Sequence, residues 1–260
     1  MDREGTVRLA VEDGRAALTL DAPARKNAIS ARMWEELIEH SAAIAQRDGV
    51  RVVSIRGAGS LFSAGADITG FDAARSGAGS SYDDLVEAAC SAIEALPMPT
   101  VASVRGVCIG AAVSLAASCD LRIATEDSHF TFPAARLGLG YDPRGVDRLV
   151  RVFGAGLTRR LLLTAERVPA ARVHALGGLD ALASADALEA ETAALVERIA
   201  MNAPLTLAAV KVAVRASLAP DDDGLRERAL GARARADASE DYAEGRRAFA
   251  EKRPPMFKGR

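Results

Sequence analysis

Two stretches decide the fold: Leu61-Phe62-Ser63-Ala64-Gly65-Ala66-Asp67-Ile68 and Gly106-Val107-Cys108-Ile109-Gly110-Ala111-Ala112-Val113-Ser114. Each stretch places small residues where the chain leaves a strand and turns. Two backbone N–H groups, one from each turn, can then point at a single oxygen atom, which is the geometry of an oxyanion hole. The alternative is that these small residues only permit close packing of a strand against a helix.

Strand and helix patterns alternate on both sides of these stretches. Asp13-Gly14 is a favoured turn for a hairpin, and Ser30 is a typical N-cap for the helix that follows. Apolar runs predict strands at residues 7–11, 16–20, 50–55, 100–104 and 121–124. The alternation predicts a layered α/β core with crossover connections. From Arg144 onward the pattern is helical, and we expect no further strand in the sheet.

Composition excludes several classes of function. The chain has 260 residues and a net charge of −2, so it offers no broad basic field for a nucleic acid or an anionic membrane. The charged N-terminus does not resemble a signal peptide, and no apolar run is long enough to span a bilayer. We therefore expect a cytoplasmic protein with a small-molecule substrate.

Other polar and aromatic residues predict packing rather than chemistry. The 3 cysteines form no C-x-x-C pair and are expected to be buried free thiols. Trp34 is expected in a core or interface, and His40 and His174 on helices. No His, Asp and Glu cluster has metal-ligand spacing. Residues 70–81 are, by composition, the most mobile loop, and residues after Pro255 are expected to be a solvated terminus.

Several blocks in fixed order resemble the crotonase superfamily, the enoyl-CoA hydratase/isomerase proteins. They are Arg25-Lys26-Asn27-Ala28, the two stretches quoted first, Cys119-Asp120-Leu121-Arg122-Ile123-Ala124 and the C-terminal block from Glu244 to Arg253. The resemblance implies a ClpP-like spiral of ββα units at residues 1–195 and a helical C-terminal region at 196–260, within one structural unit. It also implies a homotrimer or homohexamer, fatty-acid metabolism with lyase or isomerase chemistry, and an acyl-CoA thioester as ligand with no other cofactor.

The same resemblance assigns the oxyanion hole. The backbone N–H groups of Ala66 and Ala111 would hold the thioester carbonyl oxygen, and Gly110 would begin a helix whose dipole assists. Donors fixed in advance stabilise an enolate more than they stabilise the substrate, and one such donor contributes about 3 kcal/mol.

Residues near both quoted stretches match the positions that bind CoA. They are Arg25, Lys26, Ala28, Ala64, Asp67, Ile68 and Gly110. Phe249 and Lys252 match positions that close the site, often from a neighbouring subunit. For each cation, the alternative is an ordinary solvated surface charge.

The two catalytic glutamates of hydratases that resemble this chain are replaced here. Ser114 stands at the first position and Ala134 at the second. Water addition needs one group to take a proton and another to deliver one. Hydration by the usual mechanism is therefore disfavoured. Ser114 with His129 could suggest a serine hydrolase, but the sequence contains no nucleophile turn and no partnered acid.

Asp142 is the carboxylate that remains near the site. It matches the catalytic aspartate of dienoyl-CoA isomerases and chlorobenzoyl-CoA dehalogenases, and burial beside a thioester would raise its pKa. The alternative is a helix cap, because Asp before Pro143 is a strong N-cap and N1 pair.

Two hypotheses of function follow. In the first, the protein is an enzyme that polarises an acyl-CoA carbonyl through Ala66 and Ala111 and uses Asp142 for isomerisation or other enolate chemistry. In the second, it is a non-catalytic acyl-CoA-binding protein. A hydratase with an atypical site is a further alternative.

Overall fold

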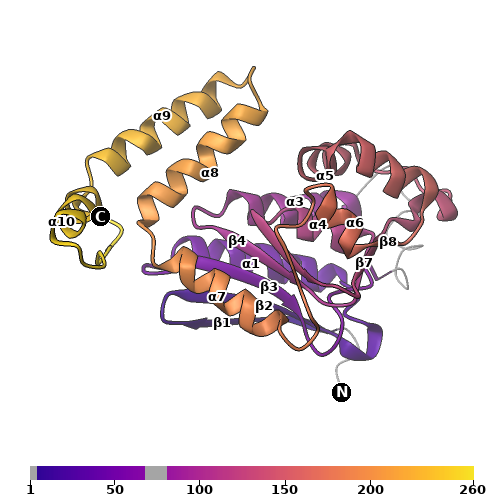
Figure 1. Ribbon diagram of the computed structural model, residues 1–260. Coiled ribbons are helices and arrows are strands. Elements are labelled where there is room, and N and C mark those ends of the chain that lie inside the picture. Colours follow the sequence, from indigo (N-terminus) through magenta and orange to yellow (C-terminus); the bar gives the residue numbers. More distant parts are fainter. Residues whose placement is uncertain (1–4, 68–80) are drawn as a thin grey trace.

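The computed structural model describes residues 5–67 and 81–260. Its main sheet has the strand order β1-β2-β3-β4-β6-β9, and a smaller sheet has the order β5-β7-β8 (Figure 1). In the described part of the main sheet, β1 and β2 pair antiparallel and the other neighbouring strands pair in parallel. The main-sheet strands are Thr6–Glu12, Arg15–Asp21, Val52–Gly57, Thr100–Val104, Leu121–Thr125 and Ala181–Ala183. The smaller sheet contains Val107–Ile109, His129–Thr131 and Val168–Pro169.

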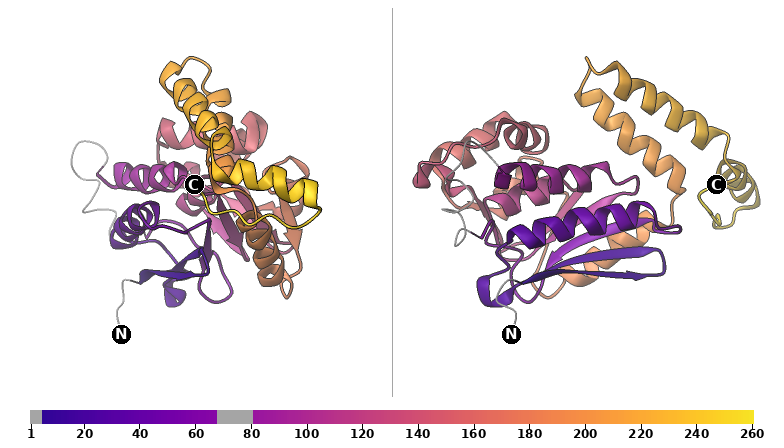
Figure 2. Two further views of the ribbon diagram at one scale, coloured as in Figure 1. Left: turned by 90° about the vertical axis from the view of Figure 1, so that its left-hand side faces the viewer. Right: turned by 180° about the vertical axis from the view of Figure 1, so that it is seen from behind.

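Helices cover both faces of the main sheet (Figures 1 and 2). Helices α1, α3, α4 and α5 belong to the larger apolar core, and α7 packs on the opposite face against Val52, Val101 and Ile123. The α-helices are α1 Ala31–Ala45, α3 Ser81–Ala95, α4 Ala111–Ala117, α5 Pro143–Thr164, α6 Ala170–Ala175, α7 Leu188–Ala200, α8 Pro204–Leu218, α9 Asp223–Asp237 and α10 Glu240–Glu251. The short helices η1 and η3 are Pro23–Arg25 and Pro133–Leu137.

Local sequence signals explain the first half of the chain. Arg15 pairs with Glu12 across the Asp13-Gly14 turn, as the hairpin prediction requires. The Ser30 hydroxyl accepts a hydrogen bond from the Met33 amide at 3.3 Å, so it caps α1 as predicted. Trp34 is fully buried, and its indole N–H donates to the Tyr82 hydroxyl at 2.9 Å. This bond ties α1 to α3.

The C-terminal half differs from the expectation in two short strands, β8 in the smaller sheet and β9 in the main sheet. Residues Ala181–Ala183 form β9, which pairs with β6 and extends the main sheet, so the expectation of helices alone was wrong. Helix α7 crosses residue 195 and packs on the sheet, and the projecting helices begin at Pro204. The division expected between residues 195 and 196 stays a prediction.

The α8–α9 hairpin projects from the body of the molecule (Figure 2). Its own buried cluster consists of Ala209, Ala232 and Ala236. Lys211 attaches α8 to the body, because its ammonium group lies 2.8 Å from the Asp120 carboxylate and 3.2 Å from the Met98 carbonyl oxygen. Asp120 also accepts hydrogen bonds from the Thr100 amide and hydroxyl, so the attachment reaches the start of β4.

The expectation of a solvated terminus after Pro255 was wrong. The Asp241 carboxylate accepts the amides of Lys258 at 2.6 Å and Gly259 at 2.7 Å, and Arg51 donates to the Phe257 carbonyl oxygen. Glu244 accepts from Arg253 at 2.6 Å. Buried carboxylates on α10 therefore fold the last residues back against the protein.

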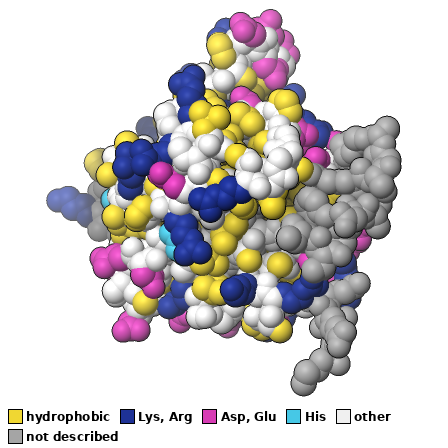
Figure 3. Space-filling model, turned by 90° about the vertical axis from the view of Figure 1, so that its right-hand side faces the viewer, with side chains coloured by type: hydrophobic (Ala, Val, Ile, Leu, Met, Phe, Trp, Pro, Cys, Tyr) yellow, Lys and Arg dark blue, Asp and Glu magenta, His cyan; other side chains and the backbone are white. Residues whose placement is uncertain are grey.

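One face of the molecule carries charged side chains of both signs (Figure 3). Figure 3 shows basic, acidic and apolar side chains interspersed on the side that carries α5 and β8.

All three cysteines are buried and free, as predicted, and burial raises the pKa of Cys90 to about 11. Among the described residues, no single helix is long and apolar enough to cross a bilayer; α7 and α8 would suffice only together, and they are bent by 102°.

Candidate functional site

A strained turn before α1 supports the first of the two quoted stretches. Asn27 has a left-handed φ of 54° and is only 1% exposed. Its side chain accepts from the Ala22 amide at 3.0 Å and donates to the carbonyls of Ala58 and Leu61 at 2.9 and 2.8 Å. The Asn27 amide group therefore fastens this turn to the loop that leads to Ala66.

The two quoted stretches run side by side in parallel. Ser63 bridges Cys108: the Ser63 amide donates to the Val107 carbonyl at 3.1 Å, and the Ile109 amide donates to the Ser63 carbonyl at 3.2 Å. Continuing this register by three residues places Ala66 beside Ala111. The stretches that sequence reasoning singled out are thus neighbours in the fold.

The Ala66 amide is turned toward the second stretch. Gly65 and Asp67, on either side of it, both bond to Ile29, at 2.7 and 2.9 Å. Because alternate groups of an extended chain point in opposite directions, the Ala66 N–H points away from Ile29. Ala111 is the first residue of α4, so its N–H has no acceptor within the helix. Within residues 5–67 and 81–260, neither amide donates to a protein acceptor.

Gly65 allows the two stretches to approach closely. Its φ is 92°, and a Cβ atom on it would lie 2.3 Å from the Ile109 carbonyl oxygen and 3.5 Å from the Ala111 nitrogen. Only glycine fits this position without displacing the neighbouring strand. Gly110, with φ 56°, then turns the chain into α4, and its amide donates to the Thr131 carbonyl at 2.9 Å.

The two positions at which the resemblance leads us to expect glutamates in related hydratases are buried here and carry no charge. Ser114 is fully buried, and Ala134 is 7% exposed. The Ser114 hydroxyl lies 2.5 Å from the Tyr141 hydroxyl. The Tyr141 ring packs edge-to-face on Phe132, with ring centroids 4.8 Å apart. Sequence reasoning missed Tyr141, although its place next to Asp142 was the available signal.

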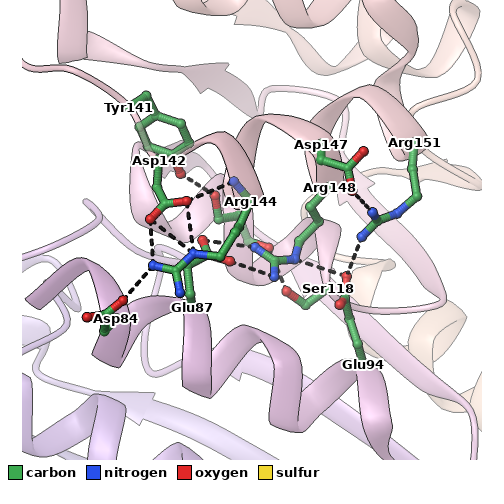
Figure 4. Close-up of polar contacts among 11 residues, drawn as sticks. Asp84, Glu87, Glu94, Ser118, Tyr141, Asp142, Arg144, Asp147, Arg148 and Arg151 are labelled. Atoms are coloured by element: carbon green, nitrogen blue, oxygen red, sulfur yellow. Dashed lines mark hydrogen bonds and ion pairs between the residues drawn. The ribbon is translucent and has the colours of Figure 1, made fainter. Parts of the chain in front are cut away.

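Asp142 is a helix cap, and the expected rise in its pKa was wrong. Its carboxylate accepts from the Arg144 amide at 2.8 Å and from the Arg144 guanidinium, which also bonds to Asp84 (Figure 4). Hydrogen bonds from the Arg144 side chain lower the pKa of Asp142 and outweigh the opposing effect of burial. The carboxylate is therefore ionised at neutral pH and a weaker base than an isolated aspartate.

A buried ion cluster joins α3 to α5 beside this residue. Arg148 pairs with Glu87 at 2.9 Å and with Glu94 at 3.0 Å, and both Arg148 and Glu87 are almost fully buried (Figure 4). The cluster borders a cleft of about 360 Å³, whose arginines are all paired with acids. Among the described residues that line this cleft, each arginine is therefore balanced by an acid.

The residues expected to bind CoA fall into two groups. Arg25, Lys26 and Ala28 lie in or beside the turn that contacts Ala64, whose amide donates to the Lys26 carbonyl at 2.9 Å. Arg25 is paired with Asp67, so its charge is largely neutralised. Phe249, 87% exposed, and Lys252 lie on or just after α10, remote from α4 in the same chain (Figures 1 and 2). Ile68 and residues 70–80 of the loop expected at 70–81 lie outside the described residues, and Ser81 begins α3.

The serine hydrolase alternative has no support in the geometry. Among the described residues, the side-chain partner of the Ser114 hydroxyl is Tyr141 and not a histidine. His129 lies in β7, with its Nε2 atom buried and unpaired, and burial lowers its pKa. The described part of the chain contains no group of His, Cys, Asp and Glu placed to hold a metal ion.

Comparison with known proteins identifies the family of the chain. The enoyl-CoA hydratase/isomerase family model matches residues 11–260. The chain is 33% identical to the probable enoyl-CoA hydratase echA6 of Mycobacterium leprae over 95% of this chain and 97% of that protein. It is 31% identical to the 2,3-dehydroadipyl-CoA hydratase of Escherichia coli, over 94% of each.

A solved structure with a closely similar fold is an enoyl-CoA hydratase/carnitine racemase from Magnetospirillum magneticum. Its TM-score is 0.92 at 32% identity, covering 100% of this chain and 97% of that one. The protein therefore belongs to the enoyl-CoA hydratase/isomerase family and has the crotonase fold predicted from its sequence. Its ligands are accordingly of the acyl-CoA class.

Proposed function

We propose that the protein binds an acyl-CoA thioester, polarises its carbonyl through the Ala66 and Ala111 amides and promotes enolate chemistry rather than standard hydration. The observation that carries the proposal is that both amides lack a protein acceptor on stretches held in parallel register. Each donor would stabilise the enolate oxygen by about 3 kcal/mol.

The absence of carboxylates at Ser114 and Ala134 argues against hydration. Adding water requires both a base for the water proton and an acid for the α-carbon. Isomerisation and other enolate reactions can proceed with one group that removes and returns a proton. Introducing Ser114→Glu together with Ala134→Glu is expected to create measurable hydration of crotonyl-CoA if the pocket is otherwise standard; a folded double variant with no gain would contradict that assumption.

Asp142 is the group that we propose for proton transfer. It is ionised at neutral pH and lies at the start of α5, next to Tyr141. Asn caps a helix about as well as Asp, so Asp142→Asn removes the charge and keeps the cap. Wild-type protein in D₂O should place deuterium on the α-carbon of a bound acyl-CoA, and Asp142→Asn should slow this exchange. Unchanged exchange in the variant would exclude Asp142.

A second candidate function is non-catalytic acyl-CoA binding. The observation in its favour is that Ser114 contacts the Tyr141 hydroxyl, and this pair supplies no carboxylate base. Enoyl-, dienoyl- and 3-hydroxyacyl-CoA should then bind without product formation and without α-carbon exchange. Turnover of any of them would exclude this function.

We also propose that the protein assembles into a homotrimer or homohexamer and is located in the cytoplasm. Phe249 and Lys252 lie on or just after α10, which is remote from α4 in the same chain (Figure 1), so we propose that they close the CoA site of another copy in a homotrimer or homohexamer. The projecting α8 also exposes Val210 and Val214, which a second subunit would cover. Sedimentation equilibrium tests this assembly, and a monomer at micromolar concentration would contradict it. A cytoplasmic location stays an expectation from the sequence.

A further inference from the structure

The two hydroxyl groups of Ser114 and Tyr141 form a built feature of the site. Their oxygens are 2.5 Å apart, and Ser114 is fully buried. The Tyr141 ring is fixed between Phe132 and Gly145: a Cβ atom on Gly145 would lie 2.8 Å from the ring. Figure 4 shows Tyr141 above the ion cluster, at the start of α5. The pair is therefore held in place by packing on several sides.

One proton of this pair has no acceptor in the protein. Two hydroxyls carry two protons, and the bond between them uses one. Within residues 5–67 and 81–260, neither hydroxyl has another hydrogen-bond partner. Burial raises the pKa of Tyr141, so its hydroxyl stays protonated at neutral pH. The site thus presents a donor where two glutamates would present acceptors.

The position of Ser114 relates this donor to the acyl chain. Ser114 follows Ala111 by three residues on α4, so both lie on one face, separated by about 4.5 Å along the helix axis. The β-carbon of a thioester is two C–C bonds, each about 1.5 Å, beyond the carbonyl carbon. A carbonyl oxygen held at Ala111 would therefore bring the β-carbon into the neighbourhood of the hydroxyl pair.

On the basis of the proposed thioester site, we propose that Ser114 and Tyr141 together donate a hydrogen bond to a neutral acceptor oxygen on the β-carbon. The site would then select acyl chains with a 3-oxo group. A saturated chain would leave the buried donor unpaired and cost binding affinity, whereas a ketone oxygen accepts the bond without supplying a competing donor.

Matched thioester pairs test this selection. Titration calorimetry would compare 3-oxoacyl-CoA with the saturated acyl-CoA at four, eight and twelve carbons, with free CoA as reference. Wild-type protein should bind the 3-oxo member about 2- to 10-fold more tightly, as expected for one hydrogen bond. The double variant Ser114→Ala, Tyr141→Phe keeps the packed shapes but lacks both hydroxyls, and its ratio should fall to about one.

Tyr242→Phe is the control, because it removes an exposed hydroxyl on α10, and it should keep the wild-type ratio. Thermal unfolding of all three proteins checks that the variants fold. Equal binding of both thioesters to wild-type protein, or a preserved preference in the folded double variant, would overturn this proposal alone. Failure of wild-type protein to bind any acyl-CoA would overturn the proposed function as well.

Discussion

Gly65→Ala tests the close approach on which the candidate site depends. The added Cβ would lie 2.3 Å from the Ile109 carbonyl oxygen. Ordinary contacts begin near 3.5 Å, so the two stretches must separate by about 1 Å. The left-handed φ of 92° would cost a non-glycine residue about 1–2 kcal/mol. Overpacking would add about 1–3 kcal/mol.

Gly59→Ala is the matched control, because Gly59 also has a left-handed φ, of 72°, but no atom within 4 Å of an added Cβ. The free energy of unfolding of Gly59→Ala should fall only by the cost of placing alanine at a left-handed φ, with no cost of overpacking. Thermal unfolding would measure both variants, at about 2–4 °C per kcal/mol for a protein of this size.

The same comparison tests function. Displacing a positioned group by 1 Å can reduce a rate about a hundredfold. Deuterium exchange at the α-carbon should fall by that order in Gly65→Ala and stay near the wild-type rate in Gly59→Ala. If both variants matched in melting temperature and exchange rate, the close approach of Gly65 to Ile109 would not be what positions the site.

Two further predictions concern residues outside the proposed chemistry. Asn27→Ala would leave the Ala22 amide and the Ala58 and Leu61 carbonyls unpaired, and should lower the free energy of unfolding in urea by about 3 kcal/mol or more. Asn202 is exposed, so Asn202→Ala is the control and should change this free energy by no more than about 0.5 kcal/mol. An equally small effect of Asn27→Ala would contradict the anchoring role of Asn27. Glu244→Gln should lower the melting temperature at pH 7, because hydrogen bonds from Arg253 and Arg247 hold the pKa of Glu244 below its usual range. A lowered pKa stabilises the fold above the unfolded-state value of about 4.3, and this stabilisation is lost as the pH falls further. The difference between wild type and variant should therefore be constant from pH 5 to 7 and shrink in melting curves below about pH 4; a difference that persisted unchanged to pH 3 would refute the assignment.

Local signals made much of the fold predictable. Ser30 caps α1 through its own hydroxyl, and residues Thr100–Val104 form a strand that is buried along its whole length. The family blocks also carried long-range information, since the stretches around Ala66 and Ala111 prove to be adjacent. Such features depend on residues close in sequence or on a pattern shared with related proteins.

Features that depend on distant partners were not predictable in the same way. Strand β9 is made of Ala181, Leu182 and Ala183, which have little intrinsic preference for strands, and its pairing with β6 decides its structure. The last residues fold back because the carboxylates of Asp241 and Glu244 accept hydrogen bonds from the amides of Lys258 and Met256, more than ten residues later in the chain. The pKa of Asp142 is lowered by hydrogen bonds from Arg144, which is only two residues later, so this effect could have been predicted from the sequence.

The alanine cluster inside the α8–α9 hairpin has a consequence for dynamics. Alanine buries a single methyl group, worth about 0.8 kcal/mol, so Ala209, Ala232 and Ala236 give the hairpin little cohesion of its own. In an isolated chain, its amide protons should exchange with solvent through local opening, far sooner than those of β4, which exchange only when the whole body unfolds. Contact with another subunit would slow amide exchange in the α8–α9 hairpin more than in the body of the protein, so the exchange rate of the hairpin would report on assembly.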